Sequence, residues 1–236
     1  MIIVNADDFG LSENVNEAII RSFKEGIISS TTIMANMPAF DDAVKLAYDN
    51  KINEKIGLHF NIMEGRPLTE EIMLCPRLCA DGRVFTYKRN SVFKWTTKEK
   101  EAIRAEFNAQ YNRVIKTGIK PTHLDSHLHV HTEIPIYLAI REDIKKLGIK
   151  RIRRSRNVGV SLKVMPYKFI TNTLYKLDGL KMMRYFTVYD SIKKSYDSIE
   201  LMCHPTIDLS NNQIVDAVTH KKLFKLFEDL SSYQLL

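Results

Sequence analysis

Short apolar runs alternate with amphipathic stretches along the first two thirds of the chain. Residues 2–6 (IIVNA) form one apolar run, and after Ser12, a helix-capping residue, apolar side chains recur at helical spacing as far as Gly26. The same alternation predicts strands at 31–36, 56–60 and from Pro121 onward, and helices at 40–48, 98–117 and 133–147. Strands and helices that alternate in this way are typical of parallel βα units.

The periodicity is weaker beyond Ile149. It predicts a strand at 149–153, a helix at 163–177, strands at 185–189 and 198–203, and a last helix at 217–230. About seven parallel strands fit either a closed barrel or an open doubly wound sheet, and the pattern alone does not choose between them. Residues 61–96 interrupt the alternation with prolines and an Asp-Gly pair. We therefore expect a single domain over 1–236 with an irregular insertion at 61–96.

Composition excludes several classes of protein. The 236 residues are 44% hydrophobic and 27% charged, which excludes a disordered chain. A chain of this length buries roughly 70 to 75% of its surface and needs no disulfide staples. No run reaches the ~20 apolar residues of a membrane span, and no export segment opens the sequence. With only three cysteines, Cys75, Cys79 and Cys203, all interpreted as free thiols, we expect a cytoplasmic protein without a membrane partner.

The formal net charge of +7 is partly concentrated in one segment. Residues 145–156 hold seven Lys or Arg and no acidic residue. Such a run could bind nucleic acid or another anionic surface, but it lacks the interleaved aromatic residues and the recognition motif that usually accompany that function. We interpret it first as a solvated helix end and strand edge, and keep nucleic-acid binding as an alternative whose signature is a steep loss of affinity in salt.

Two adjacent carboxylates, Asp7 and Asp8, follow the first predicted strand. Neighbouring side chains at a strand end point in different directions, so one carboxylate can hold a cation while the other faces a water beside it, as metal hydrolases require. An Asx turn into the following helix is an equally simple interpretation. His59 ends the strand IGLHF two βα units later, so its imidazole should project from the same rim.

The densest group of candidate ligands is PTHLDSHLHVH at 121–131. If the segment is extended, five side chains share one face: His123, Asp125, His127, His129 and His131. A helix would instead align the first, second and fourth histidines. Pro121 and a helix cap at Thr132 favour the extended form, although a strand of ordinary length cannot hold all five. Four histidines in nine residues indicate a metal-binding or catalytic role for at least one of them.

Two further positions are candidates for chemistry. His204 precedes Pro205, which holds it extended, so it should lie at the end of a strand, with Cys203 facing the opposite side. Glu64 and Arg66, in the loop after His59, are either substrate contacts or a solvated pair. The sequence has no Gly-rich phosphate loop and no nucleophile elbow, which favours metal-assisted hydrolysis over covalent or nucleotide-dependent mechanisms.

Five motifs in order resemble the YdjC-like carbohydrate deacetylases, which include the chitooligosaccharide deacetylases. They are VNADDFGLS at 4–12, STT at 30–32, IGLHF at 56–60, PTHLDSHLHVH at 121–131 and ELMCHP at 200–205. The resemblance implies a deformed TIM-like barrel, a homodimer, one divalent metal ion, and removal of the N-acetyl group from an amino sugar or a short chitin-type oligosaccharide. It further implies that Asp8, His59 and His127 are the metal ligands and that Asp7 is the carboxylate beside the bound water.

The remaining roles follow from the chemistry of amide cleavage. An amine anion is a very poor leaving group, so a general acid must protonate the nitrogen, and we assign that role to His204. Asp125 is expected to orient one of the imidazoles. Family members are described with magnesium, whereas two imidazoles and a carboxylate would suit zinc equally. The same ligands would serve a non-haem iron oxygenase, but those enzymes usually have jelly-roll barrels, against which the βα pattern argues.

Overall fold

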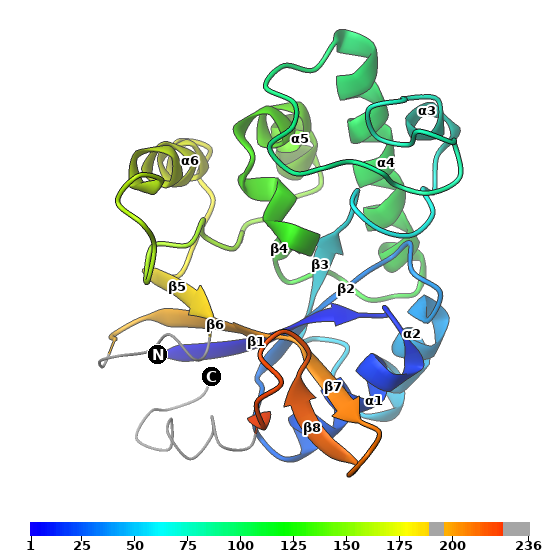
Figure 1. Ribbon diagram of the computed structural model, residues 1–236, viewed down its shortest axis with the longest axis vertical. Helices are drawn as coiled ribbons and strands as arrows, with labels where there is room; N and C mark the ends of the chain where they lie inside the picture. Colours follow the sequence, from blue (N-terminus) through cyan, green and yellow to red (C-terminus); the bar gives the residue numbers. More distant parts are fainter. Residues whose placement is uncertain (189–195, 224–236) are drawn as a thin grey trace.

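The computed structural model describes residues 1–188 and 196–223, and a parallel sheet with the strand order β4-β3-β2-β1-β6-β5 lies at its centre (Figure 1). The strands are β1 (Ile2–Phe9), β2 (Ser30–Ile33), β3 (Ile56–Phe60), β4 (Leu124–Ser126), β5 (Tyr185–Val188) and β6 (Ile199–Cys203). Each neighbouring pair in the sheet is parallel. The βα arrangement predicted from the periodicity is therefore confirmed.

Backbone hydrogen bonds through residues 150–153 curl this sheet toward a barrel. Leu124 N donates to Arg151 O at 3.0 Å on one side of the segment, and Ile152 N donates to Lys181 O at 3.0 Å on the other. These are isolated parallel bridges, so the strand predicted at 149–153 is present only as a link between β4 and the chain before β5. The expected deformed TIM-like barrel is confirmed as a curled half-barrel of six strands.

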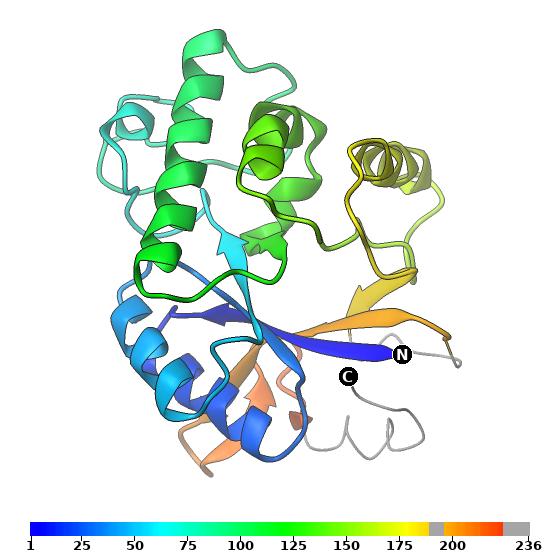
Figure 2. The same ribbon diagram turned by 180° about the vertical axis from the view of Figure 1, so that it is seen from behind.

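Helices flank the curled sheet along its length. They are α1 (Glu13–Lys24), α2 (Phe40–Asp49), α3 (Glu70–Met73), α4 (Thr97–Lys116), α5 (Ile134–Lys146) and α6 (Met165–Leu177). Figures 1 and 2 show α1 and α2 beside β1 and β2, and α4, α5 and α6 further round the curl, toward β3, β4 and β5. Ser12 caps α1 as predicted, since its Oγ accepts from Val15 N at 3.3 Å. The cap of α5 is Glu133 rather than Thr132. Within the described residues, no helix is both long and apolar enough to cross a bilayer.

Strand residues are buried in two chemically different environments. Val4, Ala6, Leu58, Leu124 and Leu201 are fully buried in the apolar core that the strands share with the helices. Polar residues of the same strands are nearly or fully buried as well: Asn5, Asp7, Thr32, His59, Asp125 and Glu200. Burial of polar groups is unfavourable unless they are hydrogen-bonded or paired. These buried polar residues are therefore the candidates for a functional site.

The segment 61–96 contains one short helix, α3, and no strand among its residues, all of which the structure describes. It is attached to α4 by Glu106, whose carboxylate accepts from Leu68 N and Thr69 N at 3.0 Å. Gln110 Nε2 donates to Asn61 O at 2.6 Å at the start of the segment. The loop that follows His59 is thus held in place by α4.

The chain after β6 differs from the prediction. Residues 205–216 form an antiparallel hairpin of β7 (Pro205–Asp208) and β8 (Gln213–Asp216), where no element was expected. The hairpin lies against α1, and Asn14 Nδ2 donates to Thr206 Oγ1 at 2.9 Å. The helix predicted at 217–230 is wrong for 217–222, because the chain turns back there and Lys222 pairs with Val215 of β8. Residues 224–230 of that prediction, like position 189 of the strand predicted at 185–189, lie outside the described residues.

Candidate metal centre

An irregularity at the end of β1 directs Asp7 and Asp8 to the same buried region. The register between β1 and β2 shifts between Ala6 and Phe9, and Asp8 has φ of 70°. Strict alternation along a strand would send adjacent side chains to opposite faces of the sheet. Backbone in the left-handed region is unfavourable for a residue with a Cβ, although Asp tolerates it better than most. The shift leaves Asp7 2% and Asp8 8% exposed.

Asp8, His59 and His127 converge on one point. Asp8 Oδ1 lies 3.1 Å from His59 Nε2 and 2.9 Å from His127 Nδ1. Candidate ligand atoms of the three residues all lie within 4.8 Å of one another. The His59 side chain is 1% exposed and that of His127 is 13% exposed, so the cluster is shielded but reachable.

The hydrogen bonds of His59 show that a cation fits this cluster. Asp125 Oδ1 lies 2.7 Å from His59 Nδ1, and Thr32 Oγ1 donates to Asp125 Oδ2 at 3.0 Å. With Nδ1–H donating to Asp125, Nε2 faces the Asp8 carboxylate at hydrogen-bond distance, so either a proton or a metal cation lies between these two acceptors. Bonds of about 2.0 to 2.2 Å to zinc or magnesium place adjacent ligand atoms about 3 Å apart, as found around Asp8.

The electrostatics of the cluster agree with this fit. Burial lowers the pKa of His59, but the charge and hydrogen bond of Asp125, together with Asp8, outweigh burial and raise the pKa to about 10. Burial raises the pKa of the Asp8 carboxyl, but the two imidazoles outweigh it and hold that pKa well below its usual value. In the metal-free protein, His59 therefore holds its proton strongly beside the ionised Asp8 carboxylate. A divalent cation would displace that proton, so its affinity should increase with pH.

The histidine motif does not form one extended face. β4 ends at Ser126, and His127–Thr132 (η1) form 3₁₀ turns in which Leu128 has φ of 48° and His129 has φ of 58°. The Ser126 hydroxyl accepts from His131 N at 2.9 Å and closes the turn. The expected alternation is therefore wrong beyond Ser126, because this local hydrogen bond competes with the sheet and turns His127 back toward Asp8.

The other three histidines of the motif lie outside the cluster of Asp8, His59 and His127. A Cβ on Gly57 would come within 2.5 Å of the His123 ring, and burial lowers the pKa of His123 to about 4. His131 Nε2 lies 3.2 Å from Arg153 O, and burial lowers its pKa to about 3. The His129 ring packs against Phe186 with 5.8 Å between ring centroids. His123 and His131 are therefore packed, hydrogen-bonded side chains, and His129 is packed against Phe186.

Arg153 joins the carboxylates of the site, which the sequence did not predict. It is 1% exposed, and its Nη1 and Nη2 donate to Asp7 Oδ2 and Oδ1 at 2.6 and 2.7 Å. Nη1 also lies 2.8 Å from Asp125 Oδ2, and Nε donates to Glu200 Oε1 at 2.5 Å. The interpretation of 145–156 as a solvated segment is therefore wrong for this residue. The sequence did contain one indication of this role: Arg153 ends the predicted strand 149–153, and the ends of parallel strands lie on the same rim as the aspartates.

Asp7 is fixed beside the metal cluster by this guanidinium. Oδ1 accepts from Arg153 and also from Asn5 Nδ2 at 2.9 Å, while Oδ2 accepts from Arg153 alone among the residues that the structure describes. Each carboxylate oxygen has two lone pairs, so Oδ2 retains one that can accept a proton. Oxygens of Asp7 and Asp125 and a His59 ring nitrogen all lie within 4.8 Å of one another, which places Asp7 next to the cluster.

His204, directly after β6, is paired with Asp216 of β8. The backbone N of His204 donates to Asp216 Oδ2 at 2.8 Å, and Nδ1 lies 3.7 Å from the same oxygen. Burial lowers the pKa of His204, but Asp216 and the charges of Asp7 and Asp8 raise it overall. Asp216 was missed, although two four-residue runs around Asn211-Asn212 are a hairpin pattern.

The loop after β3 brings Glu64 to the cluster but not Arg66. Glu64 Oε2 lies 3.2 Å from His127 Nε2. Asn61 Nδ2 donates to Glu64 O at 2.7 Å, and Asn36 Nδ2 donates to Arg66 O at 3.1 Å, so side-chain amides hold the loop. The Arg66 residue is exposed. Its assignment as a substrate contact is a prediction that these contacts do not test.

Comparisons with known proteins find similar sequences and a similar fold over most of the chain. A family model described as YdjC-like protein matches residues 1–229. A curated carbohydrate deacetylase of Vibrio parahaemolyticus is 36% identical over 209 residues, which cover 86% of this chain and 77% of that protein. One of Halalkalibacterium halodurans is 34% identical over 207 residues, covering 86% and 84%. A crystal structure from Enterococcus faecalis is described as that of a candidate cellobiose-phosphate cleavage protein. It is 22% identical in sequence, and the match covers 98% of this chain and 94% of that chain with a TM-score of 0.74. The two proteins therefore share the same fold.

Proposed function

The chain belongs to the YdjC-like family, and on that basis we propose that it is a metal-dependent hydrolase that removes the N-acetyl group from an amino sugar or a short chitin-type oligosaccharide. The relatives named carbohydrate deacetylases support the reaction, in which water cleaves a linear amide to acetate and an amine. The observation that carries the proposal is the convergence of Asp8, His59 and His127 on one point beside Asp7.

Asp8, His59 and His127 would hold the divalent cation. When bound, such an ion polarises the acetamide carbonyl and lowers the pKa of a bound water. Two imidazole donors suit zinc, whereas magnesium prefers oxygen ligands. Carboxylate oxygens are also available here, because Asp8 and Glu64 both lie beside His127. Asp125 supports the site by fixing the tautomer and orientation of His59 through the bond at Nδ1.

Asp7 is the general base of the proposed reaction. Its Oδ2 has the unoccupied lone pair that receives a proton from the attacking water. Arg153 and Asn5 keep the carboxylate in one orientation, so the acceptor atom does not need to be positioned during the reaction. When Asp7 becomes neutral, Arg153 remains paired with Asp125 and Glu200, so its charge stays compensated.

His204 is the general acid. The charges and the hydrogen bond that raise its pKa keep the imidazole protonated closer to neutral pH than an isolated histidine would be. The proton passes from His204 to the leaving nitrogen as the carbon–nitrogen bond breaks, so that an amine leaves rather than its anion. Asp216, held in β8 by its bonds to Val218 N and Thr219 N, positions the imidazole.

The test of the proposed function is acetate release from N-acetylglucosamine and N,N′-diacetylchitobiose. We expect release by the purified protein, loss of release after treatment with a chelator, and recovery on addition of zinc or magnesium. Cellobiose, which carries no acetamide, is the control substrate. Absence of acetate from every N-acetylated sugar in the presence of each metal would contradict the proposal.

His204→Ala should lower kcat by about 10² to 10⁴-fold with a smaller effect on KM, because removal of a general acid acts on the transition state. Asp216→Asn should move the alkaline limb of the pH–kcat profile to lower pH. The sign follows from the pairing: Asp216 raises the pKa of His204, so without its charge the acid loses its proton at a lower pH. Steady-state kinetics across pH check both variants.

Asp208→Asn is the matched control for this pair of variants. Asp208 lies in the same hairpin, but its carboxylate bonds to Ser210 and Asn211 at the exposed turn. Its pH profile should equal that of the wild type. An unchanged kcat in His204→Ala would remove His204 from the mechanism, and an unmoved alkaline limb in Asp216→Asn would remove Asp216 as its positioning residue.

A further inference from the structure

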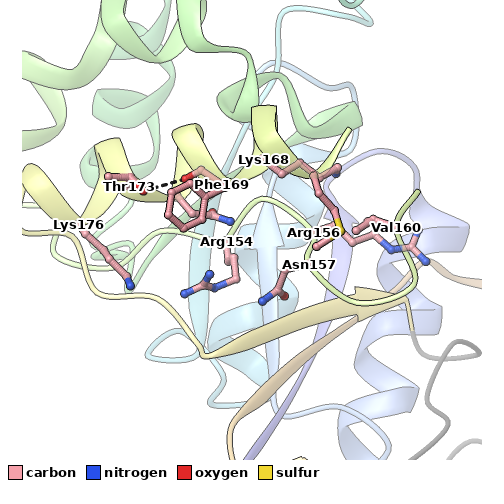
Figure 3. Close-up of a pocket in the computed structure, with 10 residues that line it drawn as sticks. Arg154, Arg156, Asn157, Val160, Lys168, Phe169, Thr173 and Lys176 are labelled. Carbon is pink, nitrogen blue, oxygen red and sulfur yellow. Dashed lines mark hydrogen bonds between the residues drawn. The ribbon is translucent and has the colours of Figure 1, made fainter. Parts of the chain in front are cut away.

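A cationic cavity lies between α6 and the loop 154–160, and it shares no lining residue with the metal centre (Figure 3). Its volume is about 160 Å³, less than the pockets that hold drug-sized ligands. Four of its lining residues are cations: Arg154, Arg156, Lys168 and Lys176. Over the part of the chain that the structure describes, no aspartate or glutamate lines it.

The walls of the cavity are fixed to each other by Asn172 of α6. Its Oδ1 accepts from Ser155 N at 2.8 Å, and its Nδ2 donates to Ser155 O at 3.0 Å. Lys168, Asn172 and Lys176 are spaced by four residues and therefore share one face of α6. Figure 3 shows the two lysines on the helix, with Arg154, Arg156 and Asn157 on the opposite wall. The cavity is therefore built before any ligand enters.

Arg154 and Lys168 of the cavity are partly desolvated, whereas Lys176 is exposed. Arg154 Nε donates to Met183 O at 2.9 Å, which fixes the guanidinium, and burial lowers the pKa of Arg154. Burial, followed by the charges of Arg89 and Arg156, lowers the pKa of Lys168. Positive charges held near one another and away from water are unfavourable unless an anion compensates them.

Several cations outside the cavity, on α4 and α5, form ion pairs with carboxylates. Lys145 and Arg141 of α5 lie 3.1 and 3.2 Å from Asp178 Oδ1, and Arg104 lies 2.6 Å from Asp143 Oδ2. By contrast, no carboxylate of the described ranges forms an ion pair with Arg154, Lys168 or Lys176. Arg154, Lys168 and Lys176 thus differ from Arg104, Arg141 and Lys145, which each have a carboxylate partner.

We propose that this cavity binds a phosphate group, either as inorganic phosphate or as the phosphate of a small ester. The planar guanidinium of Arg154 matches phosphate oxygens, and lysines add point charges to a dianion. Arg153 and Arg154 are consecutive, but their side chains have different partners. Arg153 binds the carboxylates of the metal centre, and Arg154 lines the cavity. Within the basic segment 145–156, Lys145 pairs with Asp178, Arg153 lies at the metal centre, and two arginines line the cavity. These four residues therefore do not form the continuous stripe that a nucleic acid requires.

Isothermal titration calorimetry of the full chain with inorganic phosphate and with glucose 6-phosphate tests the proposal. We expect saturable binding that weakens about tenfold or more in Lys176→Gln and in Arg154→Gln, since each removes a charged hydrogen-bond donor. Lys163→Gln, an exposed lysine before α6 that does not line the cavity, should bind like the wild type. His127→Ala should also bind like the wild type, which separates this site from the metal centre.

The two ligands distinguish the source of the phosphate. Equal affinities indicate inorganic phosphate, and tighter binding of glucose 6-phosphate indicates an ester. Absence of saturable binding for both ligands at millimolar concentration, or an equal loss in Lys163→Gln, would overturn the proposal. So would a single-stranded oligonucleotide that binds in a salt-dependent way and loses affinity in Arg154→Gln while both small phosphates fail. Because Lys176 is exposed, its variant should fold even if that of Arg154 does not.

Discussion

We expect His127→Ala to abolish metal binding and acetate release together, and His59→Ala to do the same. Each variant removes one of three donors that meet around Asp8 Oδ1, and two remaining protein ligands do not retain a zinc-type ion against dialysis. Metal content after dialysis, measured by inductively coupled plasma mass spectrometry, gives occupancy. Added zinc at about 100 times its Kd should stabilise the wild type by about 2.7 kcal/mol and leave both variants unshifted in thermal unfolding.

Two matched variants show whether the loss is specific to the ligands. His129→Ala lies in the same motif, outside the cluster, and should retain the metal. Asp7→Asn should also retain it, while kcat falls by about 10² to 10⁴-fold, because the amide cannot accept the proton of the attacking water. Full occupancy in His127→Ala would refute that ligand assignment, and loss of the metal in Asp7→Asn would make Asp7 a ligand rather than a base.

Arg153→Met should lower the free energy of unfolding by about 3 to 5 kcal/mol, because it leaves the carboxylates of Asp7, Asp125 and Glu200 buried without their cation. Methionine keeps much of the volume, so the loss reports charge rather than a cavity. Urea unfolding of the metal-free proteins measures it. Arg184→Met is the control, since Arg184 and Asp197 form a pair with 65% and 60% of their side chains exposed, and its loss should be about 0 to 1 kcal/mol.

The effect of Arg153→Met should depend on pH. Burial raises the pKa of Asp125, but Arg153 and His59 outweigh it and hold that pKa below its usual value. A depressed carboxyl pKa contributes stability that is present above the unfolded-state pKa and is lost as pH falls through the folded-state pKa. The difference between wild type and variant should therefore be largest at neutral pH and shrink in acid. A difference that equals that of Arg184→Met at neutral pH would contradict the role assigned to Arg153.

Local periodicity predicted the elements whose environment repeats along the chain. The helix after Ser12 and the strands at β1, β3 and β6 are where the pattern placed them. It failed where a partner distant in the sequence decides the backbone. Val215 pairs with Lys222 and prevents the predicted helix at 217–222, and the Ser126 hydroxyl binds His131 N and ends the extended histidine segment. The assignment of Asp8, His59 and His127 as ligands stays a prediction that the occupancy experiment tests.

The sequence by itself determined the order of the βα units and the kinds of side chain that stand where strands end, because hydrophobic period and chain direction depend only on near neighbours. Only the tertiary structure decided how those side chains are used. It shows that the register shift at Asp8 turns two adjacent carboxylates inward, and that Arg153 reaches Asp7 across 146 positions. It also shows that Asp216 faces His204 across a hairpin. Buried charges are tolerated only with a partner at hydrogen-bond distance, and such a partner is chosen by the fold and not by proximity in the sequence.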